Sequence, residues 1–218
     1  MKKKELDLQN LSAEDFLKLL EDKKGDLSNV YYTVIEAVVM KGIYYFSISL
    51  GNGTFKGVYN CNNAIFENIY NCNNATFKDV YHCDDAAFEN GYHCDDAAFE
   101  NGYYCDNATF KDGYYCHNAT FENGYYCDNA TFKDGYYCHN ATFENGYYCD
   151  SGTFKGVYFC DNATFKNGYH CHNATFDNGY YCDNATFDGH FYAYNHAKIG
   201  QAYFMWKTTK VHLDWRQL

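Results

Sequence analysis

The chain has 218 residues, no proline, 25 tyrosines and 18 phenylalanines. This aromatic content is far above that of a disordered chain, so we expect the protein to fold. Its formal net charge of −11 argues against nucleic acid and against an anionic membrane surface as ligands, because both need a basic protein surface. We therefore expect no nucleic-acid and no membrane partner.

Residues 1–20 begin with a short lysine run, but no apolar run follows it. A secretory signal needs such a run, and no later stretch is long enough to span a bilayer. These observations predict a cytoplasmic protein whose thiols stay reduced.

Residues 1–29 are predicted to form a capping helix and a linker. Ser12 and Asp15 fit a capping box at a helix start, and Gly25 follows a lysine-rich last turn. We expect a helix over residues 12–21 that packs on the first coil and covers an open sheet edge.

Twelve cysteines recur every eleven residues, from Cys61 to Cys182, without insertion or deletion. A fixed period of this kind is typical of a stack of identical structural units. We predict an all-β fold with a single elongated β-solenoid over residues 30–191, regular from 57 to 188. Residues 192–218 are expected to form a C-terminal strand cap.

One repeat, residues 113–123, reads Gly-Tyr-Tyr-Cys-His-Asn-Ala-Thr-Phe-Glu-Asn. Tyr-Tyr-Cys and Ala-Thr-Phe are β-like runs, and turn residues separate them. Side chains alternate between the two sides of a strand, so the first Tyr, the Cys, the Ala and the Phe should point inward. The middle residue of each run should then point outward.

Two coil lengths, eleven and twenty-two residues, are compatible with this repeat. Charges alternate along the chain at one turn position, as in Lys111, Glu122, Lys133 and Glu144. Eleven residues per coil would place opposite charges about 4.8 Å apart in neighbouring coils, whereas twenty-two would stack like charges. We therefore favour eleven residues per coil and keep twenty-two as the alternative.

Part of the repeat, such as residues 108–112, resembles a pentapeptide repeat, in which a small residue and a Phe or Leu two positions later point inward. This resemblance covers five of every eleven residues and implies a four-sided coil. The chain is also similar to the midge-type antifreeze solenoid in its short coil, its cysteine ladder and its outward tyrosine stack. That family has more than one cysteine per coil, where this chain would have one.

The cysteine ladder and the histidines are candidates for metal or redox chemistry. An inward cysteine beside alanine is a small apolar side chain, and buried thiols are usually inert. Histidines such as His82 and His117 should point outward, away from the sulfurs, and a metal site needs ligands that converge. We therefore expect no metal site and no cofactor.

The outward residues are predicted to form one straight aromatic stripe and one threonine file opposite it. An aromatic stripe of this length exceeds what solubility requires and favours a flat or periodic partner, although ring packing alone also stabilises such a stack. The candidate binding residues are Tyr104, Tyr115, Tyr126, Tyr137, Tyr148, Tyr181, Thr109, Thr120, Thr131, Thr142, Thr153, Thr164, Thr175 and Thr186.

No catalytic motif is present, and a repeated array lacks the unique, asymmetric group of side chains that catalysis needs. We expect a non-enzymatic protein that binds a repetitive surface, with ice as the most specific candidate, or a protein partner. A homodimer through a ladder face or a cap is a further expectation. The alternatives are an acidic, DNA-mimic-like regulator of a DNA-binding protein and a thiol-based metal or redox protein.

Overall fold

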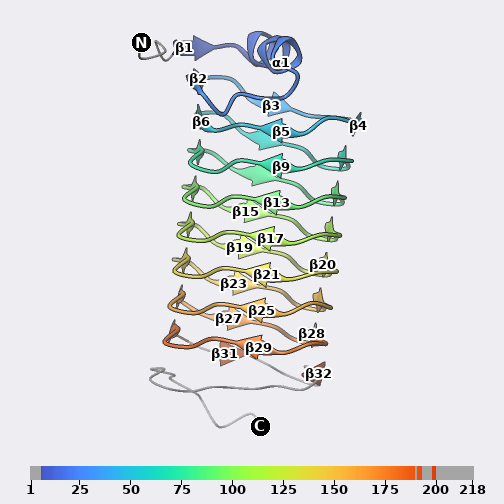
Figure 1. Cartoon of the computed structure of the whole chain (residues 1–218). Coiled ribbons are helices and arrows are strands. Elements are labelled where there is room, and N and C mark those ends of the chain that lie inside the picture. Colours follow the sequence, from blue (N-terminus) through green and yellow to red (C-terminus); the bar gives the residue numbers. More distant parts are fainter. Residues whose placement is uncertain (1–5, 190, 193–197, 200–218) are drawn as a thin grey trace, which may run out of the picture.

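The computed structural model describes residues 6–189, 191–192 and 198–199, and it shows a parallel β-solenoid with one short helix at its N-terminal end (Figure 1). Successive coils lie on one another along a single axis, and nearly all strands are two residues long. The predicted all-β solenoid built from eleven-residue repeats is confirmed.

Each coil contains two repeats, so the preferred coil length of eleven residues was wrong and the alternative of twenty-two is correct. Tyr81 pairs with Tyr59 and with Tyr103, and Phe77 pairs with Phe55 and with Phe99. Two repeats supply four strands per coil, which lie on four sides. We number these sides face 1 to face 4 in the order in which the chain visits them.

Faces 1 and 3 carry the Ala-Thr-Phe runs and lie on opposite sides of the coil (Figure 1). Face 1 consists of β1 (Leu6–Leu11), β2 (Val30–Val34), β6 (Asn52–Phe55), β10 (Thr76–Phe77), β14 (Ala98–Phe99), β18 (Thr120–Phe121), β22 (Thr142–Phe143), β26 (Thr164–Lys166) and β30 (Thr186–Asp188). Face 3 consists of β4 (Ile43–Tyr44), β8 (Ile65–Phe66), β12 (Ala87–Phe88), β16 (Thr109–Phe110), β20 (Thr131–Phe132), β24 (Thr153–Phe154), β28 (Thr175–Phe176) and β32 (Lys198–Ile199).

Faces 2 and 4 carry the Tyr-Tyr-Cys runs, and they are the other opposed pair. Face 2 consists of β3 (Val38–Val39), β7 (Tyr59–Asn60), β11 (Tyr81–His82), β15 (Tyr103–Tyr104), β19 (Tyr125–Tyr126), β23 (Tyr147–Tyr148), β27 (Tyr169–His170) and β31 (Phe191–Tyr192). Face 4 consists of β5 (Ile48–Ser49), β9 (Tyr70–Asn71), β13 (Tyr92–His93), β17 (Tyr114–Tyr115), β21 (Tyr136–Tyr137), β25 (Tyr158–Phe159) and β29 (Tyr180–Tyr181).

The interior is made of stacked rings, as the alternation of side chains predicted. Phe99 and Phe121 stack in parallel at 4.9 Å, and Phe99 meets Tyr103 edge to face at 4.8 Å. Such aromatic pairs contribute about 0.5–1.5 kcal/mol each beyond their buried area. Several buried Tyr hydroxyls find polar partners there; the thiol of Cys83, for example, donates to the hydroxyl of Tyr103 at 3.4 Å.

The volume of these inward side chains explains the coil length. Eleven residues can enclose a perimeter of at most about 40 Å, which leaves little room between opposed walls that pack about 10 Å apart. Twenty-two residues give a four-sided interior that accommodates two Tyr, two Phe, two Cys and two small residues per coil. Lys111 accordingly pairs with Glu89, twenty-two residues earlier, and not with Glu122.

Residues in the left-handed backbone region form the corner that follows each cysteine. Asn107, Asn118 and Asn129 have φ of 58°, 57° and 58°. Asparagine tolerates this conformation better than other residues with a side chain. The repeated Asn thus supplies the left-handed conformation that the turn needs. Its side-chain amide also links adjacent coils, since Asn140 Nδ2 donates to Asn118 Oδ1 at 3.1 Å.

The N-terminal helix α1 spans Ala13–Asp22 and confirms the predicted cap. Ser12 is its N-cap and accepts a hydrogen bond from the backbone N–H of Asp15 at 3.1 Å. Phe16 is buried and packs against Tyr32 and Phe55 of the first coils. Among the described residues, no helix is long and apolar enough to cross a membrane.

Strand β1 was missed by the sequence analysis. It pairs in parallel with β2, so the solenoid begins before residue 30. The first coils lack the Cys repeat that marks the later ones, and this strand therefore has no recognisable repeat pattern. At the other end, β31 and β32 continue the stack. The remainder of the expected cap at 192–218 lies outside the described residues.

Candidate binding faces

The outward aromatic residues form two ladders on opposite faces, which corrects the expectation of one stripe. Because strands pair with strands twenty-two residues away, the outward residues of successive eleven-residue repeats lie alternately on face 2 and on face 4. The face 2 ladder consists of His82, Tyr104, Tyr126, Tyr148 and His170. The face 4 ladder consists of His93, Tyr115, Tyr137, Phe159 and Tyr181.

Within each ladder the rings are nearly parallel and evenly spaced. On face 2, the ring of Tyr126 lies 4.6 Å from that of Tyr104 and 4.8 Å from that of Tyr148, with interplanar angles of 5° and 4°. On face 4, Tyr115 and Tyr137 stack at 4.9 Å and 3°. Burial raises the pKa of Tyr115 and of Tyr126, because the stacked rings exclude water from one another.

A glycine two residues earlier provides the seat for each outward tyrosine. A Cβ on Gly113 would lie 2.5 Å from the Tyr115 ring, and one on Gly135 would lie 2.3 Å from the Tyr137 ring. The phenol therefore lies flat over the backbone of the preceding turn. All six candidate tyrosines have a glycine at this position, and the repeat with an outward phenylalanine, Phe159, has a valine.

The candidate threonines lie on the other two faces. Thr120 pairs with Thr142 on face 1, and Thr131 pairs with Thr153 on face 3. Thr164 and Thr186 continue the first file, and Thr109 and Thr175 belong to the second. Each tyrosine ladder therefore has threonine files on the two neighbouring faces, and the face opposite it carries the other aromatic ladder instead of the expected threonine file.

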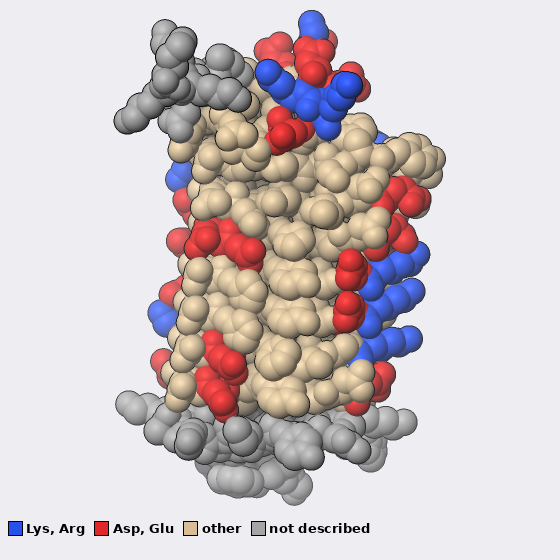
Figure 2. Space-filling model, viewed as in Figure 1, with Lys and Arg blue, Asp and Glu red and all other residues tan. Residues whose placement is uncertain are grey.

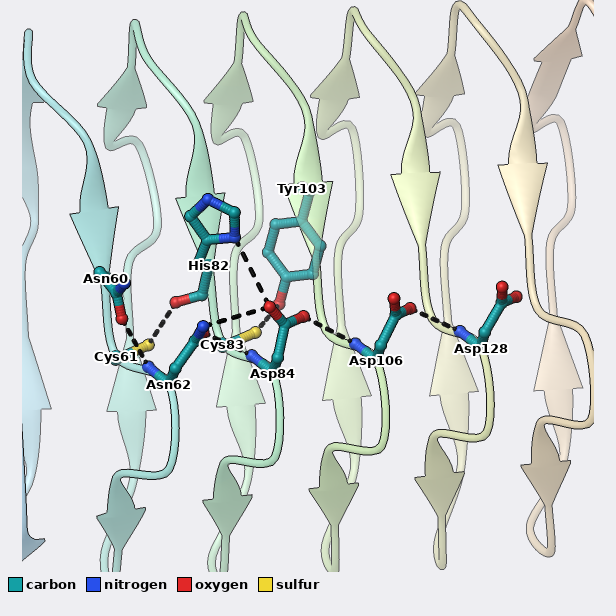
Figure 3. Close-up of polar contacts among 9 residues, drawn as sticks. All are labelled: Asn60, Cys61, Asn62, His82, Cys83, Asp84, Tyr103, Asp106 and Asp128. Atoms are coloured by element: carbon teal, nitrogen blue, oxygen red, sulfur yellow. Dashed lines mark hydrogen bonds and ion pairs between the residues drawn. The ribbon is translucent and has the colours of Figure 1, made fainter.

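Four aspartates stack along the edge between faces 2 and 3, and Figure 3 shows three of them, Asp84, Asp106 and Asp128. Asp84 Oδ1 accepts the backbone N–H of Asp106 at 3.0 Å, and Asp106 Oδ1 accepts that of Asp128 at 2.9 Å. Asp128 in turn accepts the N–H of Asp150 at 2.8 Å. Partial burial raises the pKa of Asp106 and of Asp128. These carboxylates join adjacent coils, and the second oxygen of Asp84 accepts a hydrogen bond from Asn62 Nδ2 at 3.2 Å.

Histidines stack on the edge between faces 4 and 1. His117 and His139 are parallel at 5.0 Å, and His139 Nδ1 lies 3.6 Å from a carboxylate oxygen of Asp161. Burial and the neighbouring His117 lower the pKa of His139. On this edge His117 and His139 lie between Asp95 and Asp161 of the neighbouring coils, so His and Asp do not alternate from coil to coil.

The charged turn position segregates onto two diagonally opposite edges. The edge between faces 1 and 2 carries the glutamate ladder, which we define as Glu100, Glu122 and Glu144. The edge between faces 3 and 4 carries the lysine ladder, which we define as Lys111, Lys133 and Lys155.

The glutamate ladder is bounded by ion pairs. Lys78 binds Glu100 at 2.8 Å and Lys166 binds Glu144 at 2.7 Å. Beside the ladder runs a column of asparagines, in which Asn123 and Asn145 donate to the carbonyls of Glu100 and Glu122 at 2.7 Å. A shallow groove of about 320 Å³ lies here, lined by Thr120, Glu122, Asn123, Glu144 and Asn145.

The cysteines are buried free thiols and point inward, as predicted. Their sulfurs form two columns, one behind face 2 and one behind face 4. Burial raises the pKa of Cys149 to about 11 and that of Cys171 to about 12. Within the described part of the chain, no three His, Cys, Asp or Glu side chains converge on a common point. The buried surroundings of the cysteines favour a packing role for them.

Two features of these surfaces were not recognised in the sequence. The glycine seats could have been recognised in the sequence, because a glycine precedes each of the six candidate tyrosines by two residues. The segregation of charge onto two edges also follows from the sequence, but only when the coil length is known. No protein-family model, curated protein or solved structure matches the chain. The resemblances to known solenoids therefore stand on motif and coil shape alone.

Proposed function

We propose that the protein is a non-catalytic repeat protein that presents its tyrosine ladders to a repetitive surface. The observation that carries this proposal is the even, parallel stacking of outward rings on faces 2 and 4. Figure 2 supports it, since an uncharged column runs down the middle of the molecule and the charged side chains gather towards its edges.

Rigidity is the second argument for a binding role. Each ring is held between its neighbours above and below and by the glycine seat beneath it. Side chains that are ordered before binding lose little conformational entropy when they meet a ligand. A lattice or a crystalline surface offers the matching regular array of sites, and ice is the most specific candidate of this kind.

Ice-crystal growth in the presence of purified protein tests the proposal. We expect the protein to shape ice crystals or to slow their growth, and Tyr115→Ala with Tyr137→Ala to weaken the effect. The matched control, Thr131→Ala with Thr153→Ala, also replaces one outward residue in each of two adjacent coils, but on face 3. It should leave the effect on ice unchanged. Normal ice growth with the intact protein would exclude ice as the ligand, and equal loss in both variants would argue against a role for face 4.

A second candidate is a DNA-mimic-like regulator of a DNA-binding protein. The stacked carboxylates of Asp84, Asp106, Asp128 and Asp150 favour it, because they form a regular acidic line on a chain of net charge −11. Binding to such a protein should compete with duplex DNA and weaken steeply with salt. Binding that does not change with salt would rule this candidate out.

A further inference from the structure

The two diagonal edges of the solenoid carry complementary charge over the same three coils. On the edge between faces 1 and 2, the glutamate ladder lies beside uncharged Asn101, Asn123 and Asn145. On the opposite edge, Figure 2 shows a row of Lys side chains that project beyond the neighbouring carboxylates. Each ladder has one residue per coil, so the charges of both repeat with the same rise of about 4.8 Å.

Several of these charges have no intramolecular ion pair among the described residues. Glu122, Lys133 and Lys155 are exposed and form none, whereas Lys111 is bound to Glu89. Asp112 lies beside Lys111, but its carboxylate accepts the backbone N–H of Gly113 at 3.1 Å. Lys133 and Lys155 therefore remain available to a partner.

The acidic edge has the shape to receive them. Its groove is lined by Glu122 and Glu144, which supply carboxylates, and by Asn123, Asn145 and Thr120, which supply further oxygen acceptors. Carboxylate and amide oxygens are the hydrogen-bond partners of an ammonium group. The stacked carboxylates of the glutamate ladder repel one another within one molecule. The lysine ladder of a second molecule would offset this repulsion by placing an ammonium group beside each carboxylate.

We propose that a second copy of this chain lays its lysine ladder into the glutamate-lined groove, so that solenoids associate edge to edge. A two-fold axis would place each edge against itself and oppose Glu with Glu. The contact is therefore heterologous, and because the two edges are diagonal, a pair of copies keeps one free glutamate edge and one free lysine edge. Such contacts generate open rows of molecules, not closed dimers.

The net charge of −11 sets the conditions for the test. At very low ionic strength, whole-molecule repulsion opposes association, whereas at about 0.15 M it is screened beyond roughly 8 Å and close pairs persist. We expect sedimentation to show an average mass at least about twice that of the monomer at high protein concentration and 0.15 M salt. At about 1 M salt, where screening reaches roughly 3 Å, the protein should be monomeric.

Charge-reversal variants identify the edges. Glu100→Lys with Glu122→Lys and Glu144→Lys makes both edges basic, and Lys111→Glu with Lys133→Glu and Lys155→Glu makes both acidic. Each variant alone should be monomeric, and a mixture of equal amounts should regain the wild-type mass. A milder pair, Lys133→Gln with Lys155→Gln, breaks no intramolecular ion pair and should still reduce the average mass.

A matched control separates local contact from net charge. Lys18→Glu with Lys23→Glu and Lys41→Glu changes the net charge as much as reversal of the lysine ladder, but these exposed residues lie outside it. This control should associate like the wild type. The proposal is overturned if the wild type is monomeric at 0.15 M salt, if the control also dissociates, or if the mixture of reversed variants stays monomeric.

Discussion

Two tyrosines that are adjacent in the chain, Tyr136 and Tyr137, illustrate the difference between the interior and the surface of this solenoid. Tyr136 is fully buried and stacks on Tyr114 at 4.9 Å, whereas Tyr137 lies outside and stacks on Tyr115 at the same distance. The interior column recurs in every regular repeat, but the outward column changes among Asn, His, Tyr and Phe. Packing constrains the first column in every coil, while the second is free to vary with function.

The largest difference between the two regions should appear in thiol reactivity. All twelve cysteines are buried, so reagents cannot reach their sulfurs in the folded protein. Burial also raises the pKa of thiols such as Cys149, whereas at Cys160 hydrogen bonds from Cys138, Cys182 and Tyr180 outweigh burial and lower the pKa to about 6, so burial alone protects that thiol. We expect a thiol reagent to label none of the cysteines at neutral pH until denaturant unfolds the chain, and then to label all twelve. Rapid labelling of folded protein would support the thiol-based function instead.

Substitution of the two neighbouring tyrosines is the next largest test. Tyr136→Ala should lower the free energy of unfolding by about 3–5 kcal/mol, because it leaves a cavity in the core. Tyr137→Ala should cost roughly 1 kcal/mol, the scale of an aromatic stack. Urea denaturation of the two variants measures both effects. Equal losses would contradict the distinction between interior and surface columns.

The glycine seat offers a smaller effect at the boundary between the two regions. Gly135→Ala would push a Cβ to 2.3 Å from the Tyr137 ring, and we expect a loss of about 1–3 kcal/mol as the ring is displaced. In the background of Tyr137→Ala the same change should cost much less, since the ring is gone. Additive losses in this double-mutant cycle would show that the ring does not rest on the glycine.

The smallest effect concerns the stacked aspartates. Partial burial raises the pKa of Asp128 above its usual value of 3.8, so the ionised form is penalised in the folded state at neutral pH. The penalty disappears as pH falls through the raised pKa of the folded state towards 3.8. Asp128→Asn, whose amide oxygen still accepts the N–H of Asp150, should stabilise the protein at pH 7 by under about 1 kcal/mol.

The pH dependence of this difference is the measurement. Urea midpoints of the variant and the wild type should converge below about pH 4. Asp134→Asn, an exposed aspartate on another edge, is the control and should change the midpoint little at either pH. A variant that is less stable than the wild type at pH 7 would show that the carboxylate is a net gain to the fold.

Local features of the candidate faces could largely be predicted. The alternation of side chains placed Tyr136 inside and Tyr137 outside, and the turn residue Asn140 at a corner. The prediction of the coil length was wrong, because it depended on which repeats lie next to each other in the stack. Repulsion between stacked like charges does not set the coil length, because exposed charges such as those of Lys111 and Glu122 are screened and interact weakly.

Periods of two and eleven along the chain predicted the solenoid, its repeat and the identity of the inward residues, and the capping box at Ser12 and Asp15 predicted the N-terminal helix. The coil length became clear only from the strand pairing, which joins residues twenty-two apart, because nearly identical repeats can stack in register at either eleven or twenty-two. The interior volume required by the Tyr and Phe rings settles that choice. The choice in turn separates the tyrosine ladders from the threonine files and places the glutamate and lysine ladders on opposite edges.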